Sequence, residues 1–227
     1  MQAQPSDRYR DLTLGGFVAR LASAEPVPGG GSASAIAASL AAGLVAMVAS
    51  LSEGRPAYAQ HAVLHRSARE TGLRLTERLL EIADEDAAAY ADFAAAMKRP
   101  RSTPDDIAER DAALAAAARH AAAVPLQCVD ACLDVVMTAE ALAGRSNRNA
   151  SSDLGVAAFL AEAAARGAAA NVLVNLPSVT DEEFVGTAMI RVDGLLHEIG
   201  RLADVTRGIV LSGERREPLV DAPAEPG

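Results

Sequence analysis

A single carboxylate inside an apolar stripe is the residue whose position most clearly suggests chemistry. Between positions 79 and 97 apolar side chains recur at the spacing of an α-helix, and Asp86 falls inside their stripe. A carboxylate there is either a core group bonded to an arginine or the backbone, or an acid or base in a pocket. Asp84 lies about 200° away around the helix axis. The two carboxylates therefore do not form a dyad by spacing alone.

Uncharged polar side chains form a second group. Asn147, Asn149, Ser152 and Asp153 gather where a polar stretch enters a helix, and Asn171 and Asn175 lie one turn apart in an apolar segment. Buried amides need hydrogen-bond partners. Helix capping by Ser152 or Asp153, with amide bonds to neighbouring helices, is one explanation. Recognition of a polar heterocycle by the same donors and acceptors is the other.

The segment Gly29-Gly30-Gly31-Ser32 precedes a predicted helix whose N-cap is Ser32. Free amides at a helix N-terminus suit a carboxylate, a phosphate or a carbonyl oxygen. A phosphate-binding P-loop is excluded, because the Gly-Lys-Ser/Thr ending is missing and no strand precedes the loop. Tight helix packing is the alternative explanation for Gly30 and Gly31.

Two other pairs give weaker signals. His61 and His65 are one turn apart without an intervening Glu, so we expect a solvated helix face rather than a metal site. Cys128 and Cys132 lie one turn apart in an alanine-rich stretch and are expected to be buried thiols.

Helical periodicity recurs along the chain, and two-residue alternation is scarce. Thr103 is the expected N-cap of a helix with Pro104 at its first position, and Pro125 should kink that helix or begin another. The predicted helices run from a cap at Ser6 or Asp7 to Leu21, from Ser32 to Leu51, from Ala57 to Met97, from Pro104 to Ala143, from Asp153 to Leu176 and from Asp181 to Ser212. The sequence predicts an all-α fold, a single-domain bundle of roughly seven or eight helices around a buried central Ala-rich helix.

The chain has 227 residues, which fits one hydrophobic core. We expect residues 1–213 to form the helical domain and residues 214–227, rich in Pro, Glu and Gly, to be a disordered tail. Small apolar residues on the helix faces favour extending the core through a symmetric homodimer.

Charge and hydropathy limit the partners and the location. The net charge of −9 opposes binding to a phosphate backbone, so no nucleic-acid partner is expected. Residues 27–52 carry no charge, but Ala, Ser and Gly dominate them, which favours a buried helix over a membrane span. No signal peptide is expected, and the protein is predicted to be soluble and cytoplasmic.

Taken together, these motifs resemble one family. The order of five motifs is similar to that of the formiminotetrahydrofolate cyclodeaminase and methenyltetrahydrofolate cyclohydrolase family. The motifs are Pro26-Val27-Pro28-Gly29-Gly30-Gly31-Ser32, Gly54-Arg55 with Tyr58, Asp84-Glu85-Asp86-Ala87, Ser152-Asp153 and Asn171-Val172-Leu173-Val174-Asn175-Leu176. The similarity spans roughly residues 10–212, and Ser146-Asn147 stands where that family usually has Gly-Asn.

The resemblance implies an all-helical homodimer or higher oligomer with a reduced folate as substrate and no cofactor or metal beyond it. It makes Asp86 the first candidate for the catalytic carboxylate, with Asp153 the second. The implied substrate-binding residues are Gly29, Gly30, Gly31, Ser32, Arg55, Tyr58, Asp84, Asn147, Ser152, Asn171 and Asn175. These elements are expected to converge on one pocket, with Arg55 at its mouth to pair with the glutamate carboxylate.

Three functions remain open at this point. Similarity around residues 103–126 and 171–183 favours conversion of 5-formiminotetrahydrofolate to 5,10-methenyltetrahydrofolate and ammonia. The alternative is hydrolysis of 5,10-methenyltetrahydrofolate to 10-formyltetrahydrofolate, which the lack of an attached formiminotransferase domain in this sequence keeps open. A non-catalytic oligomeric helical scaffold is the third.

Overall fold

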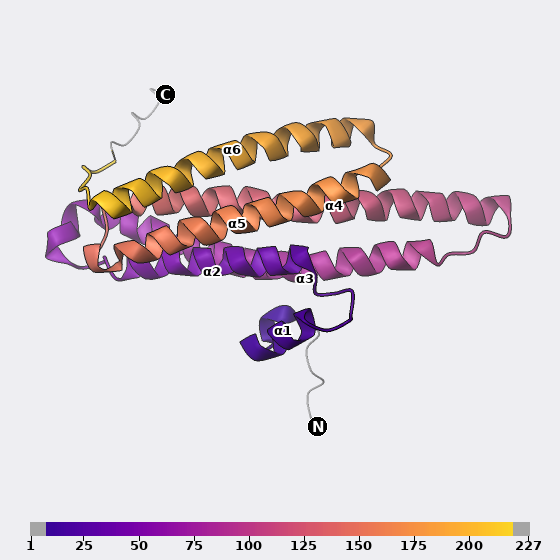
Figure 1. Cartoon of the computed structure of the whole chain (residues 1–227), viewed down its shortest axis with the longest axis horizontal. Helices are drawn as coiled ribbons and strands as arrows, with labels where there is room; N and C mark the ends of the chain where they lie inside the picture. The colour runs from indigo at the N-terminus through magenta and orange to yellow at the C-terminus, as the bar shows by residue number, and fades with distance from the viewer. Residues whose placement is uncertain (1–7, 220–227) are drawn as a thin grey trace, which may run out of the picture.

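A computed structural model describes residues 8–219, and in that range every regular element is helical (Figure 1). The α-helices are α1 (Leu14–Leu21), α2 (Gly30–Ser50), α3 (Ala62–Met97), α4 (Pro104–Leu142), α5 (Ser151–Asn175) and α6 (Glu182–Ser212). Short 3-10 helices are η1 (Tyr9–Asp11), η2 (Pro56–His61), η3 (Arg148–Ala150) and η4 (Leu176–Ser178). The all-α prediction is confirmed, with six α-helices in the described range rather than seven or eight.

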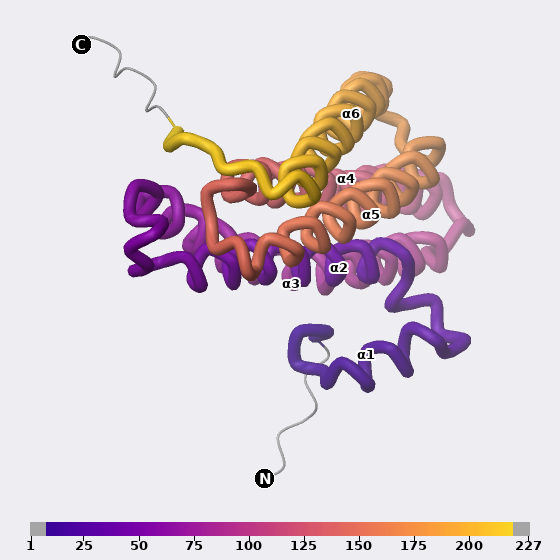
Figure 2. Tube along the Cα trace, turned by 60° about the vertical axis from the view of Figure 1, so that its left-hand side comes forward, coloured from indigo at the N-terminus to yellow at the C-terminus, as the bar shows by residue number. Residues whose placement is uncertain are grey.

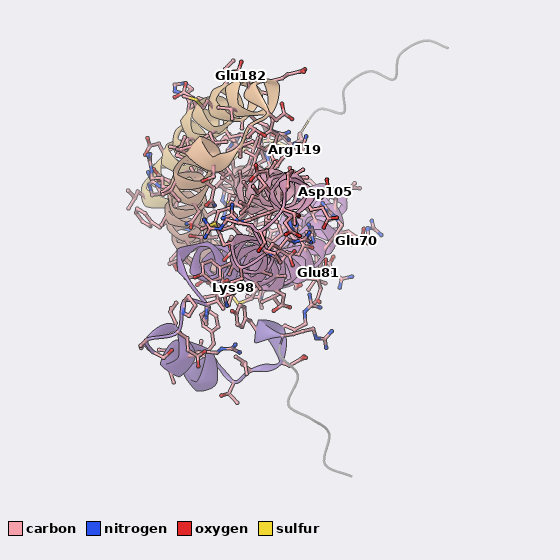
Figure 3. All side chains as sticks on the ribbon, turned by 90° about the vertical axis from the view of Figure 1, so that its right-hand side faces the viewer. Glu70, Glu81, Lys98, Asp105, Arg119 and Glu182 are labelled. Carbon is pink, nitrogen blue, oxygen red and sulfur yellow. The ribbon has the colours of Figure 1, made fainter. Side chains whose placement is uncertain are left out.

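Four helices form the body of the bundle. Helix α2 packs on α3 and α5, and α4 packs on the same two helices, while α6 covers α4 and α5. Helix α1 lies outside this body, beneath the start of α2 in Figure 2. An end-on view places Glu182, at the start of α6, on the side of the bundle opposite the N-terminal segment (Figure 3).

Small residues bring α2 and α3 into close contact. Twelve residues of α2 are buried, most of them Ala, Ser or Gly. A methyl group at Gly72 of α3 would lie 2.9 Å from both the Ala42 carbonyl oxygen and the Ala46 side chain. The prediction of a largely buried Ala-rich helix is correct, although Leu40 and Met47 of α2 are exposed.

The beginning of α4 follows its local sequence. Thr103 accepts a hydrogen bond from the Asp106 amide, and Asp106 accepts one from the Thr103 amide, which together make a capping box. Pro104 occupies the first turn as expected. Helix α4 then continues unbroken through Pro125 to Leu142.

The starts of three other helices differ from the predicted N-caps. The N-cap of α2 is Gly29, because the Ser32 hydroxyl is used in a contact with α3. Thr13 caps α1, whereas the predicted caps Ser6 and Asp7 lie outside the described residues. The N-cap position of α5 is Ala150 and has no side-chain cap, so the expected capping by Ser152 or Asp153 is wrong.

By length and composition alone, three stretches of the described chain could cross a membrane: Gly30–Ser50, Pro104–Leu142 and Arg148–Ser178. In each of them a large share of the most apolar window is buried against other helices. The absence of a membrane partner therefore stays a prediction.

Residues 214–219, the described part of the predicted tail, run along the end of α4. The Arg216 amide donates to the Gly144 carbonyl, and its guanidinium lies 2.7 Å from Glu140. Residues 220–227 lie outside the described part of the chain.

Candidate active site

The glycine loop meets Asp86 across the α2–α3 interface. The Ser32 hydroxyl lies 2.8 Å from Asp86 Oδ2 and 3.1 Å from the Ala83 carbonyl oxygen. A methyl group at Gly31 would overlap the Asp86 carboxylate, so glycine is needed here for the loop and the carboxylate to touch. Asp86 is half-buried at this junction.

The environment of Asp86 favours its protonated form. Burial raises the pKa of the Asp86 carboxyl above its ordinary value, and hydrogen bonds from the Ser32 hydroxyl and amide oppose that rise. No cation is among the groups that shift this pKa. Of the two core partners considered for Asp86, the structure therefore has the backbone, through the Ser32 amide, and not an arginine. A half-buried carboxyl with a raised pKa is also suited to proton transfer.

Asn171 of α5 completes this group. A methyl group at Gly30 would lie 3.4 Å from Asn171 Nδ2, so the amide borders the glycine loop. Asn171 Nδ2 donates to the Gly167 carbonyl at 2.9 Å, and among the described residues its Oδ1 accepts no hydrogen bond. Gly29–Ser32, Asp86 and Asn171 are called the glycine-loop site below.

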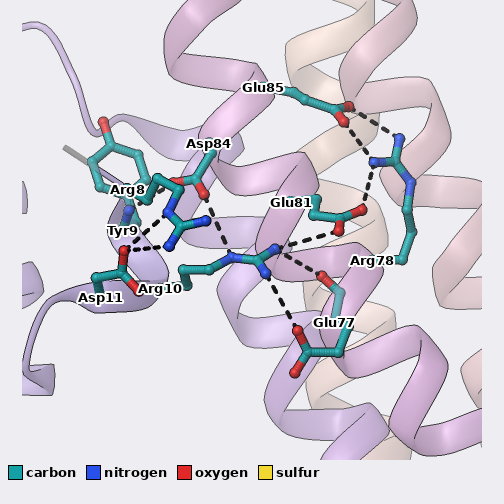
Figure 4. Close-up of polar contacts among 9 residues, drawn as sticks. All are labelled: Arg8, Tyr9, Arg10, Asp11, Glu77, Arg78, Glu81, Asp84 and Glu85. Carbon is teal, nitrogen blue, oxygen red and sulfur yellow. Dashed lines mark hydrogen bonds and ion pairs between the residues drawn. The ribbon is translucent and has the colours of Figure 1, made fainter. Parts of the chain in front are cut away.

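The N-terminal segment docks beside this site through Asp84 (Figure 4). Asp84 Oδ1 accepts a 2.6 Å hydrogen bond from the Tyr9 amide, and Asp84 Oδ2 lies 3.8 Å from the Arg10 guanidinium. Arg10 also lies within ion-pair distance of Glu77 and Glu81. The Asp84 carboxylate thus anchors η1 on α3, and a role for Asp84 in substrate binding stays a prediction.

Apart from Asn175, the remaining predicted residues lie at the opposite end of the bundle. The Asn147 amide donates to the Ser52 hydroxyl at 2.8 Å, and Asn147 Nδ2 donates to the Leu51 carbonyl. The Tyr58 hydroxyl accepts the Arg148 amide at 3.0 Å. Arg55 borders a small cavity here, Ser152 is exposed and Asp153 is half-buried on the first turn of α5. Ser52, Arg55, Tyr58, Asn147, Ser152 and Asp153 are called the Asn147 cluster below.

The two groups are separated by the length of the helices that carry them. Asp153 and Asn171 stand eighteen residues apart on α5, which is about 27 Å at 1.5 Å per residue. Ser32 and Ser52 stand at the two ends of α2 in the same way. One chain therefore does not bring all the predicted residues into a single pocket within reach of one monoglutamyl folate.

Asn175 has a structural partner. Pro125 has no N–H, so the carbonyl of Ala121, four residues earlier in α4, loses its helical hydrogen bond. Asn175 Nδ2 donates to that carbonyl at 2.9 Å. The structure thus confirms the cross-helix hydrogen bond for Asn175, while substrate binding by Asn171 and Asn175 stays a prediction.

The His61/His65 and Cys128/Cys132 pairs are buried. His61 and His65 are 5% and 1% exposed, so the expected solvated face is wrong; His65 Nε2 lies 2.9 Å from the Arg145 carbonyl. Desolvation lowers the pKa of His61. Cys128 and Cys132 are free and buried as predicted. Within residues 8–219 no group of three or more His, Cys, Asp or Glu side chains is arranged to hold a metal ion.

One residue near Asp86 had no sequence signal. Tyr9 is 4% exposed, and its ring packs against Phe17 with the Arg20 guanidinium over it. Its hydroxyl is buried without a hydrogen-bond partner among the described residues, and burial, with the charge of Asp86 adding to it, raises the pKa of the phenol. Tyr9 precedes Asp86 by 77 positions and belongs to a 3-10 turn, so no periodicity links the two.

Comparison with known proteins finds a matching family, similar sequences and a similar solved structure. Residues 13–193 match the family model described as formiminotransferase-cyclodeaminase. Methenyltetrahydrofolate cyclohydrolase from Methylorubrum extorquens is 35% identical over 84% of this chain and 91% of its own length. Formimidoyltransferase-cyclodeaminase from Mus musculus is 33% identical over 90% of this chain, which spans 38% of that protein. The crystal structure of formiminotetrahydrofolate cyclodeaminase from Thermotoga maritima superposes with a TM-score of 0.80 at 25% identity, covering 88% of this chain and 96% of that one.

Proposed function

Because the chain belongs to the formiminotransferase-cyclodeaminase family, we propose that it is a folate enzyme converting 5-formiminotetrahydrofolate to 5,10-methenyltetrahydrofolate and ammonia. The observation that carries this proposal is Asp86, a half-buried carboxylate in contact with the glycine loop and free of a neutralising cation. The nearby Asn171 adds an uncharged acceptor suited to a polar heterocycle.

The proposed reaction replaces one C–N bond of the formimino carbon by another and moves protons between the nitrogen atoms. N10 attacks the formimino carbon and forms the new N10–C bond, and the N10 proton leaves to a base. The former imino nitrogen gains two protons, one matching the proton lost from N10 and one from solvent, its bond to carbon breaks, and it departs as ammonia to leave the methenyl cation. Asp86 is the group in the glycine-loop site able to take and return a proton, and the cationic product is stabilised by a nearby carboxylate. We propose no cofactor or metal beyond the folate, because each step is a proton transfer or an addition.

Methenyltetrahydrofolate cyclohydrolase activity is the second candidate. The relative from Methylorubrum extorquens favours it, since that alignment covers most of both chains. In this reaction water attacks the methenyl carbon and loses a proton, and the N5–C bond breaks to leave 10-formyltetrahydrofolate with a proton on N5. The same carboxylate serves both reactions, because each moves a proton at the carbon that bridges N5 and N10.

Two parallel assays separate the candidates. Purified protein is given 5-formiminotetrahydrofolate, and ammonia release and the gain of methenyl absorbance are followed. A second sample is given 5,10-methenyltetrahydrofolate, and the loss of that absorbance is followed against an enzyme-free blank and the D86N variant. Ammonia release supports the cyclodeaminase. Rapid hydrolysis without ammonia release replaces it with the cyclohydrolase, and inactivity with both folates leaves the scaffold hypothesis.

The assembly and location are part of the proposal. We propose a cytoplasmic homodimer without nucleic-acid or membrane partners, supported by the net charge of −9 and by exposed apolar side chains on α2 and α5 such as Leu40, Phe159 and Val174. In such a dimer, the Asn147 cluster that approaches a glycine-loop site would come from the second copy. Light scattering during gel filtration tests the dimer, and a monomer that turns over folate contradicts it.

A further inference from the structure

The Ser32 hydroxyl has two acceptors within reach and a single proton to give them. Its oxygen lies 2.8 Å from Asp86 Oδ2 and 3.1 Å from the Ala83 carbonyl oxygen, both on α3. Ser32 is 0% exposed, so bulk water does not compete for either contact. A hydroxyl carries one proton and two acceptor lone pairs, so the direction of its hydrogen bonds depends on what its partners offer.

Asp86 is the partner that changes what it offers. The ionised carboxylate only accepts hydrogen bonds, so the Ser32 proton points to Asp86 Oδ2. A carboxyl protonated on Oδ2 instead donates to Ser32 Oγ, and the Ser32 proton then needs another acceptor. The Ala83 carbonyl is that acceptor, because its oxygen has a second lone pair beyond the one that accepts the helical hydrogen bond.

We propose that Ser32 is a positioning residue that holds Asp86 in both of its protonation states: its hydroxyl donates to the carboxylate when Asp86 is ionised, and it turns to the Ala83 carbonyl and accepts from the carboxyl when Asp86 is protonated. The change is a rotation about the Ser32 Cβ–Oγ bond. An acid–base group passes through both states in each turnover, so a partner that satisfies both keeps the carboxyl in one orientation. The catalytic consequence rests on the proposed folate reaction, whereas the switch itself does not.

The backbone around Ser32 is held on both sides, which leaves its hydroxyl as the part that turns. On the α3 side, the Ser32 amide also donates to the Asp86 carboxylate, and the missing side chain of Gly31 allows this close approach. Within α2, the Ser34 hydroxyl donates to the Gly30 carbonyl at 2.8 Å. The first turn of α2 therefore presents the Ser32 hydroxyl to α3 in a fixed place.

The titratable and charged groups around Asp86 come from η1, α1 and α3: Tyr9, Arg20, Asp84 and Glu85. The raised pKa of the Tyr9 phenol keeps it neutral, and Arg20 lies over the Tyr9 ring. Asp84 accepts from the Tyr9 amide, and Glu85 is ion-paired with Arg78. None of them is among the groups that shift the pKa of Asp86. A hydrogen bond to the carboxylate favours its charged form, so loss of the Ser32 hydroxyl raises this pKa.

The test follows two 13C NMR signals of the full-length protein against pH, the Asp86 carboxyl and the Ala83 carbonyl. The Asp86 signal is assigned by its loss in D86N. In the parent protein, we expect the Ala83 signal to titrate with the midpoint of Asp86, because the Ser32 hydrogen bond leaves this carbonyl as Asp86 ionises.

Ser32→Ala removes the hydroxyl and little else. We expect the Asp86 midpoint to move up by roughly half to one pH unit, the equivalent of one hydrogen bond. The Ala83 signal should lose most of its pH-dependent change. The pH profile of kcat should move up by the same amount as the Asp86 midpoint.

Ser39→Ala is the matched control. Ser39 is a buried serine of the same helix whose hydroxyl donates to the Ile36 carbonyl at 2.8 Å. This variant should leave both titrations and the rate profile unchanged. In D86N the Ala83 signal should no longer depend on pH over the range in which Asp86 titrates, because the amide at position 86 does not ionise.

The outcomes separate the switch from the folate reaction. An Ala83 signal that titrates equally in the parent and in Ser32→Ala senses only the charge of Asp86 and overturns the proposal. An unchanged Asp86 midpoint in Ser32→Ala also overturns it, even in a protein that turns over folate. Coupled titrations in a protein that is inactive with both folates support the switch and reject the folate assignment.

Discussion

The two ends of the bundle contain similar polar residues but use them differently. In the Asn147 cluster the protein satisfies its own groups: Asn147 bonds Ser52 and Leu51, and Tyr58 bonds Arg148. In the glycine-loop site Asp86 lacks a cation and Asn171 Oδ1 lacks a donor among the described residues. Polar groups satisfied within the fold stabilise it, whereas those with free capacity are available to a ligand.

The largest expected difference between the two ends is the loss of activity on replacing Asp86 at one end and Asp153 at the other. Asp86→Asn keeps the shape and removes the proton-transferring group, so ammonia formation should fall by on the order of 10²-fold or more. Asp153→Asn should cost at least about tenfold less. The measurement is kcat with 5-formiminotetrahydrofolate for both variants. Equal losses would contradict the difference between the two ends, and recovery of activity on mixing the two variants would then identify a site shared between copies.

Gly31 tests whether close contact with the loop matters to Asp86. An alanine methyl at this position overlaps the carboxylate, so Asp86 must move, and overpacking of this kind costs about 1–3 kcal/mol. We expect Gly31→Ala to lower kcat/KM by roughly tenfold or more, because a displaced acid–base group loses its alignment with the reacting atoms. Gly186→Ala on α6 is the control, because nothing lies within 4 Å of its added methyl group. Full activity of Gly31→Ala would show that the loop is not part of the active site.

Asn175 should behave as a residue of the fold rather than of the site. Asn175→Ala leaves the Ala121 carbonyl without its donor, and we expect a loss of about 1–3 kcal/mol in the free energy of unfolding. In a Pro125→Ala background the new amide restores the helical bond, so Asn175→Ala should cost at least about 0.5 kcal/mol less. Urea denaturation of the four proteins measures this cycle. A large rise in KM for folate in Asn175→Ala, without loss of stability, would show instead that Asn175 binds substrate.

The smallest expected effect is the pH dependence of stability at Asp86. Burial raises the pKa of this carboxyl in the folded state above its unfolded value. Its contribution to stability is therefore fully present below the unfolded pKa and is lost as pH rises through the folded pKa. Asp86→Asn, which carries no charge at any pH, should gain stability relative to the parent as pH rises from the unfolded pKa of the carboxyl through its raised folded pKa. Exposed Asp193, changed to Asn, should show no such trend in the same urea titrations.

Local sequence determined the helices because their signals lie within a few residues of one another. The capping box of Thr103 and Asp106, Pro104 in the first turn and the alanine-rich run of α2 each act over one or two helical turns. The apolar stripe also identified the face of α3 that carries Asp86. Even the separation of Asp153 from Asn171 follows from their predicted positions on one helix, because each residue adds 1.5 Å.

Only the tertiary structure decided which faces meet. Periodicity shows that a side chain points inward but not what it meets, so it could not show that Ser32 contacts Asp86 instead of capping its own helix. It could not assign Asn175 to the carbonyl that Pro125 leaves free on another helix. Nor could it bring the Tyr9 amide to the Asp84 carboxylate, 75 positions away. These contacts depend on helix crossings and on the docking of η1, which are set by packing over the whole chain rather than by neighbouring residues.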